Sequence, residues 1–189
     1  MNKTIENKTF KNVDYTSVLI TDDDYDMCNF DSCNFSEITI GAINFIECTF
    51  ENCNFSMAKL NNTSFRDVLF KNCKMLGLRF DNCNQFLLSF TFDTCMLNFS
   101  SFCNLKIPKT QYKNCKLNES DFAGANLNKS LFEQCDLNGA TFDNTLLEGA
   151  DLSTAYGFII NPESNMINNA KISTLGLAGL LTKYKLIIE

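Results

Sequence analysis

Large apolar side chains recur at every fifth position over most of this chain. The series runs without a miss through fifteen positions from Phe10 to Phe80, slips by two residues, and continues through thirteen more from Phe92 to Leu152. We call these positions centres. The residue two before each centre is mostly small or medium-sized, and eight of the ten cysteines occupy this second position, with Cys83 as a ninth if the first series is continued to Gln85.

The gaps between apolar positions therefore alternate between two and three residues. An amphipathic helix needs spacings of three and four, and a simple strand alternates with a period of two. A short extended segment with two inward side chains, followed by a corner, satisfies the observed gaps. A fixed short period over most of a chain is typical of a solenoid.

The cysteines indicate how many sides close one coil. Cys33, Cys53 and Cys73 are 20 residues apart, and the same interval separates Cys95, Cys115 and Cys135. Identical residues at this interval predict a stacked column, four sides and 20 residues per coil. The centres then fill about seven coils. The slip within residues 81–92, which contains Gln85 and Phe86, is predicted to be a local bulge that leaves one continuous column of thiols.

Units such as Ala125-Asn126-Leu127 and Ser120-Asp121-Phe122 resemble the pentapeptide-repeat family, whose units combine a small residue, Asp or Asn, and Leu or Phe. The resemblance implies an all-β fold, a right-handed quadrilateral β-helix over residues 1–156, with residues 157–189 as a C-terminal cap. The predicted core comprises Phe30, Phe35, Phe50, Phe55, Phe70, Phe122, Phe132, Cys33, Cys53, Cys73, Cys95, Cys115 and Cys135.

The cap has a different pattern. Ser173 is a candidate N-cap of a short helix, and the apolar residues after it follow helical spacing. Two interpretations stay open, because the cap either only closes the last coil or also joins two copies. The residues assigned to it are Leu177, Leu180, Leu181, Tyr184 and Ile187.

The tail begins with Ile160-Asn161-Pro162-Glu163-Ser164-Asn165-Met166-Ile167, continues to Lys171-Ile172 and ends in Leu186-Ile187-Ile188. It is also similar to the tails of the Qnr-type and microcin-immunity subgroup. This resemblance implies a protein that protects DNA gyrase and topoisomerase IV from quinolones or a peptide toxin by imitating duplex DNA. It also implies a homodimer joined at the C-terminal end. The long loops that interrupt the coils of plasmid-borne Qnr proteins are missing here, which weakens the functional inference. A general scaffold for another protein partner is the alternative that the fold alone supports.

Charge is distributed in bands. Residues 12–58 hold nine acids and no base, residues 59–118 hold nine bases against three acids, and residues 119–170 hold eight acids against Lys129. Position along a solenoid sequence is position along its axis, so acidic, basic and acidic belts are predicted. Acidic belts suit attraction to a cationic DNA-binding surface, although solvated outer faces are the simpler interpretation. The candidate partner-binding acids are Asp22, Asp23, Asp24, Asp26, Asp31 and Glu51.

Other chemistries are disfavoured. The chain has no His, which removes the commonest catalytic base and an imidazole metal ligand. Cysteines five or twenty residues apart do not have zinc-site spacing, and the acidic run at residues 22–26 lacks the pattern of an EF-hand. We expect no enzyme, no cofactor, no direct nucleic-acid binding and no membrane contact, and a cytoplasmic location. Cys103 follows a centre and is the one thiol predicted to point outward.

Overall fold

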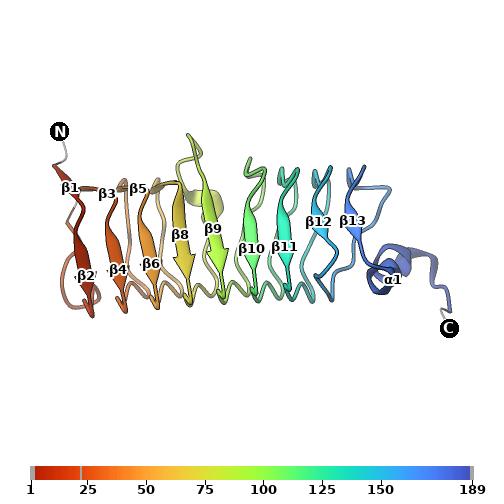
Figure 1. Ribbon diagram of the computed structural model, residues 1–189, viewed down its shortest axis with the longest axis horizontal. Helices are drawn as coiled ribbons and strands as arrows, with labels where there is room; N and C mark the ends of the chain where they lie inside the picture. Colours follow the sequence, from red (N-terminus) through yellow and green to blue (C-terminus); the bar gives the residue numbers. More distant parts are fainter. Residues whose placement is uncertain (1–2, 22, 188–189) are drawn as a thin grey trace.

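The protein is a four-sided β-solenoid of about eight turns, with its two ends at opposite ends of a rod (Figure 1). The structure is a computed structural model that describes residues 3–21 and 23–187. A short helical segment lies beyond the last coil. Among the described residues, no helix has the length and apolar character needed to span a membrane.

One side of the rod is a continuous parallel sheet of nine strands, which we call the long sheet. Its strands are β2 (Thr9–Lys11), β4 (Asn29–Asp31), β6 (Thr49–Glu51), β8 (Val68–Lys71), β9 (Phe90–Asp93), β10 (Gln111–Lys113), β11 (Leu131–Glu133), β12 (Asp151–Leu152) and β13 (Lys171–Ile172). Phe30 pairs with Phe50 and Phe50 with Phe70, a step of 20 residues, whereas Phe70 pairs with Phe92. The two extra residues therefore leave the register of this side intact.

The side before it in each coil carries a four-stranded parallel sheet, the short sheet. It consists of β1 (Thr4–Glu6), β3 (Asp24–Asp26), β5 (Asn44–Ile46) and β7 (Ser64–Arg66). After β7 the sheet stops, and single bridges resume on the same side from Lys106 to Asn126 and Leu146. The other two sides are held by such isolated bridges, for example Asn34 to Asn54 and Ser101 to Asp121.

The core is a stack of aromatic rings. Along the rod the rings lie nearly parallel, as for Phe30 and Phe50 with centroids 4.7 Å apart and Phe35 and Phe55 at 4.5 Å. Between neighbouring sides they meet edge to face, as for Phe50 and Phe55 at 5.1 Å and 80°. Both geometries are favourable for aromatic pairs. Each such burial stabilises the fold by roughly 1.5–3 kcal/mol before the entropy of ordering is subtracted.

Most corners of the coil contain a residue with positive φ. Asn is favoured there, but the corner of the short sheet also holds Glu47 at φ 50° and Lys129 at φ 61°, a conformation that costs a non-glycine residue roughly 1–2 kcal/mol. The strain is offset by ladder hydrogen bonds, since the Glu47 N–H donates to the Arg66 carbonyl at 2.8 Å. The hydrogen bonds of the backbone ladder thus maintain the same corner conformation in successive coils, even where the residue is not Asn or Gly.

The slip has a clear physical cause at Gln85. Cys83 is buried in its expected slot and the Asn84 N–H donates to the Thr63 carbonyl at 2.9 Å, so this side begins in register. The next centre is Gln85, whose amide has no partner among stacked rings, and it is exposed. The chain bulges outward over residues 84–89, and the buried side chains of Leu88 and Phe90 fill the vacated core.

Parallel pairing continues past residue 156, the boundary expected from the sequence, because β12 pairs with β13 through Asp151–Lys171 and Leu152–Ile172. This adds a coil to the predicted seven. Its pattern is hard to see because Gly157 and Pro162 stand at two of its centres. Besides η1 (Phe80–Asn82) before the bulge, the helices are η2 (Thr174–Gly176), α1 (Leu177–Leu181) and η3 (Thr182–Tyr184) at the C-terminal end.

Candidate partner-binding surface

The first half of the short-sheet side is rich in carboxylates. Strands β1, β3, β5 and β7 and the corner that follows them bring together five carboxylates, which we call the acidic half: Glu6, Asp24, Asp26, Glu47 and Asp67. Within the described ranges, none of the five forms an ion pair within 4.0 Å. Their charge is therefore available to a partner.

The register of the short sheet places these acids side by side. Thr4 pairs with Asp24 and Glu6 with Asp26, so Glu6 and Asp26 occupy equivalent positions on neighbouring strands. The Asp24 carboxylate accepts hydrogen bonds from the backbone N–H and side-chain amide of Asn44, at 3.2 and 2.7 Å. An amide from the next coil thus orients Asp24 without neutralising it.

The structure separates the six acids proposed from the sequence. Asp22 lies outside the described residues. Asp24 and Asp26 belong to β3 and Asp23 directly precedes it, whereas Asp31 and Glu51 lie on the long sheet. Glu6, Glu47 and Asp67 were missed, because the bands in the sequence give the position along the rod but not the side. Counting in steps of 20 would have placed Glu47 and Asp67 in one column.

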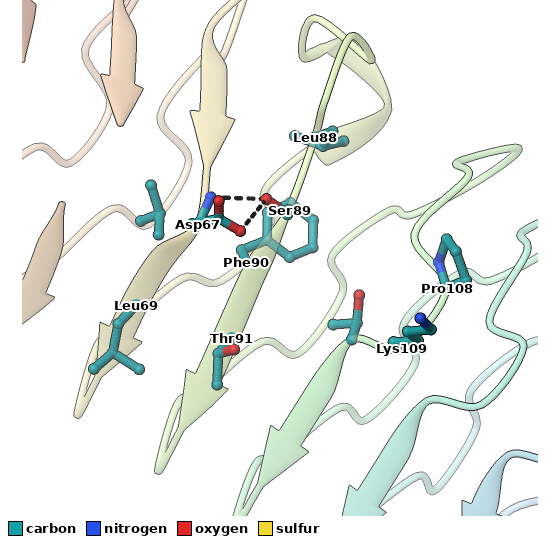
Figure 2. Close-up of a pocket in the computed structure, with 10 residues that line it drawn as sticks. Asp67, Leu69, Leu88, Ser89, Phe90, Thr91, Pro108 and Lys109 are labelled. Atoms are coloured by element: carbon teal, nitrogen blue, oxygen red, sulfur yellow. Dashed lines mark hydrogen bonds between the residues drawn. The ribbon is translucent and has the colours of Figure 1, made fainter. Parts of the chain in front are cut away.

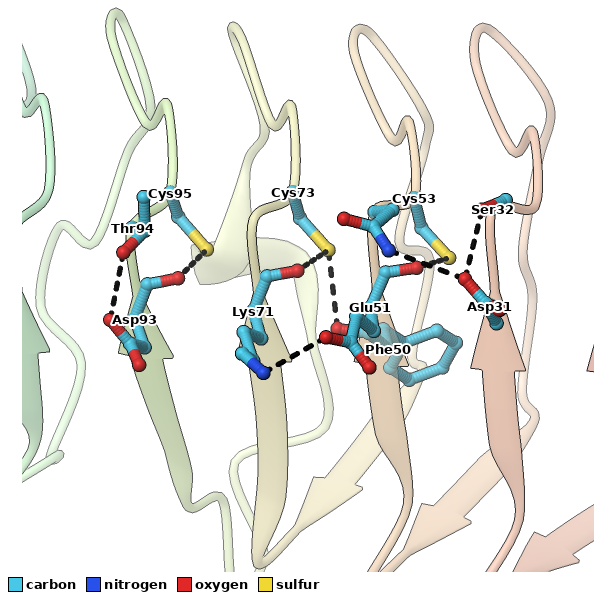
Figure 3. A network of polar contacts seen from close by, with 11 residues as sticks. Asp31, Ser32, Phe50, Glu51, Cys53, Lys71, Cys73, Asp93, Thr94 and Cys95 are labelled. Atoms are coloured by element: carbon cyan, nitrogen blue, oxygen red, sulfur yellow. Dashed lines mark hydrogen bonds and ion pairs between the residues drawn. The ribbon is translucent and has the colours of Figure 1, made fainter.

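Along the nine strands of the long sheet, acids outnumber bases by only one. Figure 3 shows part of this ladder, with Lys71 beside Glu51. Lys11 pairs with Asp31 at 3.1 Å and Lys71 with Glu51 at 2.9 Å. Hydrogen bonds from Ser32, Lys11 and Asn52 hold the pKa of Asp31 below its ordinary value. The acidic band in the sequence therefore does not make every side of the rod acidic. On the long sheet, lysines that lie just outside the band neutralise its acids.

The bulge stands next to the acidic half. The Asn84 side-chain oxygen accepts from the Phe86 N–H at 3.0 Å, a local turn that projects the two following residues outward. Phe86 is 66% and Leu87 62% exposed. The Arg66 guanidinium lies over the Phe86 ring, 5.6 Å from its centroid. The bulge thus presents two exposed apolar side chains near the middle of the rod, with the Arg66 cation packed on one of them.

A cleft of about 470 Å³ opens where the bulge returns to the coil, at the corner toward the long sheet (Figure 2). Leu88 and Phe90 contribute to its wall, with Pro108 and Lys109 on the far side. Ser89 fixes the near edge, because its hydroxyl donates to the Asp67 carboxylate at 2.9 Å and accepts from the Asp67 N–H at 2.7 Å. The cleft is shallow, with one acidic and one basic border.

The cysteines pack in columns inside the rod. Cys33, Cys53, Cys73, Cys95, Cys115 and Cys135 are at most 2% exposed. Their thiols contact backbone carbonyls, as for Cys53 with Phe30 at 3.3 Å and Cys73 with Phe50 at 3.3 Å. Burial raises the pKa of Cys48 to about 12. Protonated, buried thiols behave as small apolar groups. Cys103 is half-buried at an outward position, and burial raises its pKa too.

In residues 3–21 and 23–187, no three Cys, Asp or Glu side chains converge in a way that could hold a metal ion. The predicted core phenylalanines Phe30, Phe35, Phe50, Phe55, Phe70, Phe122 and Phe132 are all at most 1% exposed. The interior is filled by side chains, so chemistry with a partner has to take place on the outer sides.

The C-terminal end is covered by η2, α1 and η3. The Ser173 hydroxyl accepts from the Gly176 N–H at 3.2 Å and caps η2, not the α-helix itself. Glu163 accepts hydrogen bonds from Lys183 and Tyr184, which lower its pKa and hold η3 against the last coil. Leu177 and Tyr184 are about half exposed and Ile187 almost fully so, while Leu180 and Leu181 are half-buried.

These features define a class of protein: a filled, four-sided solenoid of five-residue repeats that presents charged outer walls. The chain belongs to the pentapeptide-repeat family. A family model described as pentapeptide repeats matches it in 8 copies, over residues 28–67, 48–84 and 115–153. A comparison with curated protein sequences finds no match.

Solved structures with the same fold include QnrB1, a plasmid-mediated fluoroquinolone resistance protein. Full-length QnrB1 is similar at a TM-score of 0.59 and 14% identity, over 97% of this chain and 100% of QnrB1. A trypsin-treated QnrB1 variant gives 0.50 and 18% over 100% of both chains. HetL from the cyanobacterium Nostoc sp. strain PCC 7120, which is involved in heterocyst differentiation regulation, gives 0.51 and 15% over 91% of this chain and 86% of HetL. At these identities the likeness concerns the fold.

Proposed function

We propose that this is a non-catalytic protein that binds DNA gyrase or topoisomerase IV through its acidic half and protects the enzyme from quinolones or a similar poison. The observation that carries the proposal is the cluster of five carboxylates without ion pairs on one flat side of a rigid rod. A cationic surface shaped for DNA attracts such a cluster by the same electrostatics that it uses for phosphates.

The charge density supports imitation of one DNA strand. Strands in a sheet are about 4.8 Å apart, so the four strands of the short sheet span roughly 15 Å. Five carboxylates and Arg66 over this span leave four net negative charges. This is about one charge per 4 Å, which is near one per 3.4 Å for a single strand and well below one per 1.7 Å for the duplex. We therefore expect binding weaker than that of DNA and strongly dependent on salt.

The proposal also draws on the likeness to QnrB1 in fold and on the similarity of the C-terminal tail to gyrase-protecting proteins. It is tested by supercoiling with purified gyrase in a quinolone titration. We expect the protein to raise the drug concentration that halves supercoiling, and Asp24→Lys with Asp26→Lys to abolish this shift. Asp143→Lys, on a different exposed side, is the matched control. Unchanged drug inhibition over a wide range of protein concentration would reject this partner.

A general interaction scaffold remains the second candidate, and the likeness to the regulatory protein HetL favours it. Capture of partners from cell extract on the immobilised full chain separates the two. Gyrase or topoisomerase IV subunits retained by the wild type and lost with Asp24→Lys and Asp26→Lys support the first candidate. An unrelated complex retained by both proteins supports the second.

We propose in addition that the C-terminal end joins two copies. A cleft of about 550 Å³ lies between the last coil and the cap, lined in part by Gly176, Ala178 and Gly179. Leu175, in the same cleft wall, is 92% exposed. An exposed leucine beside a hollow lined by small residues suits a symmetric contact. Light scattering on Leu175→Glu tests it, with a shift from dimer to monomer as the expected result.

A further inference from the structure

One outward residue per coil marks the corner between the short-sheet side and the long sheet, and we call this line of residues the ridge. All of its residues have left-handed φ between 49° and 66°. They are Asn7, Met27, Glu47, Asp67, Leu87, Lys109, Lys129, Gly149 and Asn169. Leu87 shares the corner's positive φ but lies in the bulge, while the register of β8, β9 and β10 places Ser89 between Asp67 and Lys109.

Charge on this ridge changes sign at the bulge. Glu47 and Asp67 precede Leu87, and Lys109 and Lys129 follow it, one per coil. All four side chains are exposed. In the part of the chain that the structure describes, none of them forms an ion pair within 4.0 Å. The ridge is therefore a dipole, negative in its first half and positive in its second.

The bulge also lies at the middle of this side. Four layers, from β1 to β7, precede it, and four layers centred on Ile107, Leu127, Leu147 and Ile167 follow it. A two-fold axis through the bulge, parallel to the strands, reverses the rod but keeps the strand direction. Each layer of one copy then faces the layer equally far beyond the bulge in the other copy.

In that arrangement the ridge is complementary to itself. Asp67 of one copy faces Lys109 of the other, Glu47 faces Lys129, and Leu87 faces Leu87. The symmetry repeats each pair, as in any isologous contact. In a parallel arrangement, by contrast, acids would face acids and lysines would face lysines. The charges on the ridge therefore favour antiparallel packing of two rods over parallel packing.

The same register gives the residue that faces each of the other charged groups on this side. Lys106 faces Ser64, Arg66 faces Pro108, Glu6 faces Asn168 and Asp24 faces Leu146, all neutral or apolar opposites. Asp26 faces Glu148, the one like-charge pair. Two opposite-charge pairs thus outweigh one repulsive pair, and the Asp26–Glu148 pair becomes a sensitive probe of the register.

We propose that this side is a docking surface for a second copy of the chain, packed antiparallel with the bulges at the two-fold axis. The exposed Phe86 and Leu87 supply an apolar centre, and the cleft beside them offers room for apolar side chains of the facing bulge. Exposed charges flank this centre, an arrangement common in protein interfaces. The contact covers the acidic half, so this pairing competes with binding of any cationic partner there.

The test is sedimentation equilibrium of the full chain, at about 50 mM and about 500 mM salt, which changes the Debye length about threefold. We expect a salt-sensitive monomer–dimer equilibrium. Glu47→Lys should weaken it about tenfold, because two attractive contacts become repulsive. Combining Glu47→Lys with Lys129→Glu in one chain should restore it. Neither residue donates or accepts a side-chain hydrogen bond in the described structure, so these variants should fold.

Glu148→Lys gives a prediction of opposite sign, since removing the like-charge pair with Asp26 should tighten the dimer. Asp143→Lys, away from this side, is the control and should change nothing. A protein that is monomeric at every concentration would overturn the proposal. So would an association that Leu175→Glu abolishes while the Glu47 and Glu148 variants leave it unchanged, because it would then belong to the C-terminal end. Failure of this proposal leaves the supercoiling test of the proposed function in place, because the acidic half of a monomer is not covered by a second copy.

Discussion

The long sheet and the short sheet are built from the same repeat, yet one continues through nine strands and the other stops after four. Both meet the two-residue insertion between Phe80 and Phe92. The long sheet absorbs it as a step of 22 residues between Phe70 and Phe92 and keeps its pairing, whereas the short-sheet side loses one layer of its ladder. The difference shows how this solenoid accommodates a polar residue at a centre position. One side of one coil bulges outward, while the stacked rings on the other sides keep the strands in register.

The largest expected effect comes from breaking the ring stack itself. Phe50 is fully buried and stacks on Phe30 and Phe70 at 4.7 and 5.2 Å. Phe50→Ala should lower the free energy of unfolding by about 3–5 kcal/mol, through lost burial and the cavity left behind. Urea unfolding followed by circular dichroism measures the loss. Gln111→Ala, an exposed position on the same sheet, should change it by less than about 0.5 kcal/mol. Similar losses in the two variants would contradict a core filled by centres.

The bulge offers a neighbouring pair that sharpens the comparison. Leu88 is 8% exposed and fills the core in place of Gln85, whereas Leu87 is 62% exposed. Leu88→Ala should therefore lower the free energy of unfolding by about 2–3 kcal/mol, and Leu87→Ala by less than about 0.5 kcal/mol. Equal effects in the same urea experiment would mean that the bulge is a surface loop and does not complete the core.

A smaller effect of opposite sign is expected inside the long sheet. The Tyr112 ring replaces a Phe in the stack, and its buried hydroxyl has no hydrogen-bond partner in the described residues. Burial raises the pKa of Tyr112 well above its ordinary value. Tyr112→Phe keeps the ring and removes the orphaned hydroxyl, so stability should stay the same or rise by about 1 kcal/mol. A clear loss would show that the hydroxyl has a partner.

The smallest expected effect concerns the cap and depends on pH. Hydrogen bonds from Lys183 and Tyr184 lower the pKa of Glu163 below 4.5. A carboxylate with a lowered pKa stabilises the folded state above its unfolded pKa and loses this contribution as pH falls through the folded value. Limited proteolysis after Lys183 should therefore accelerate below about pH 4.5 in the wild type. The Glu163→Gln variant should be cleaved rapidly at every pH. If its rate of cleavage differed from that of the wild type by the same factor at every pH, the pairing of Glu163 would be contradicted.

Much of the fold could be predicted because inward positions repeat with a fixed period. Phe30, Phe50 and Phe70 identify a side, and the cysteine interval of 20 identifies the coil. The last coil was harder to predict from the sequence. Gly157 and Pro162 interrupt its series of centres, although the backbone ladder continues to Lys171 and Ile172. Ladder hydrogen bonds do not depend on side chains, so a sequence pattern ends before the pairing does.

The candidate surface was predicted less completely. Charge bands gave Asp24 and Asp26 but also Asp31 and Glu51, which lysines of neighbouring coils neutralise. Placing an acid on a side requires the register, and placing its counter-ion requires the next coil. The exposure of Phe86 follows from the polar centre at Gln85, which was visible in the sequence as the one interruption of the series.

The central claim is that the chain leaves the coil at Gln85 on one side only, and amide hydrogen exchange tests it most directly. We expect the amides of Leu69 and Thr91, in β8 and β9, to exchange only through global unfolding. Those of Phe86 and Leu87 should exchange many orders of magnitude faster. Exchange of β8 and β9 at the rate of the bulge would mean that the insertion divides the rod into two separately unfolding halves, and would contradict the account.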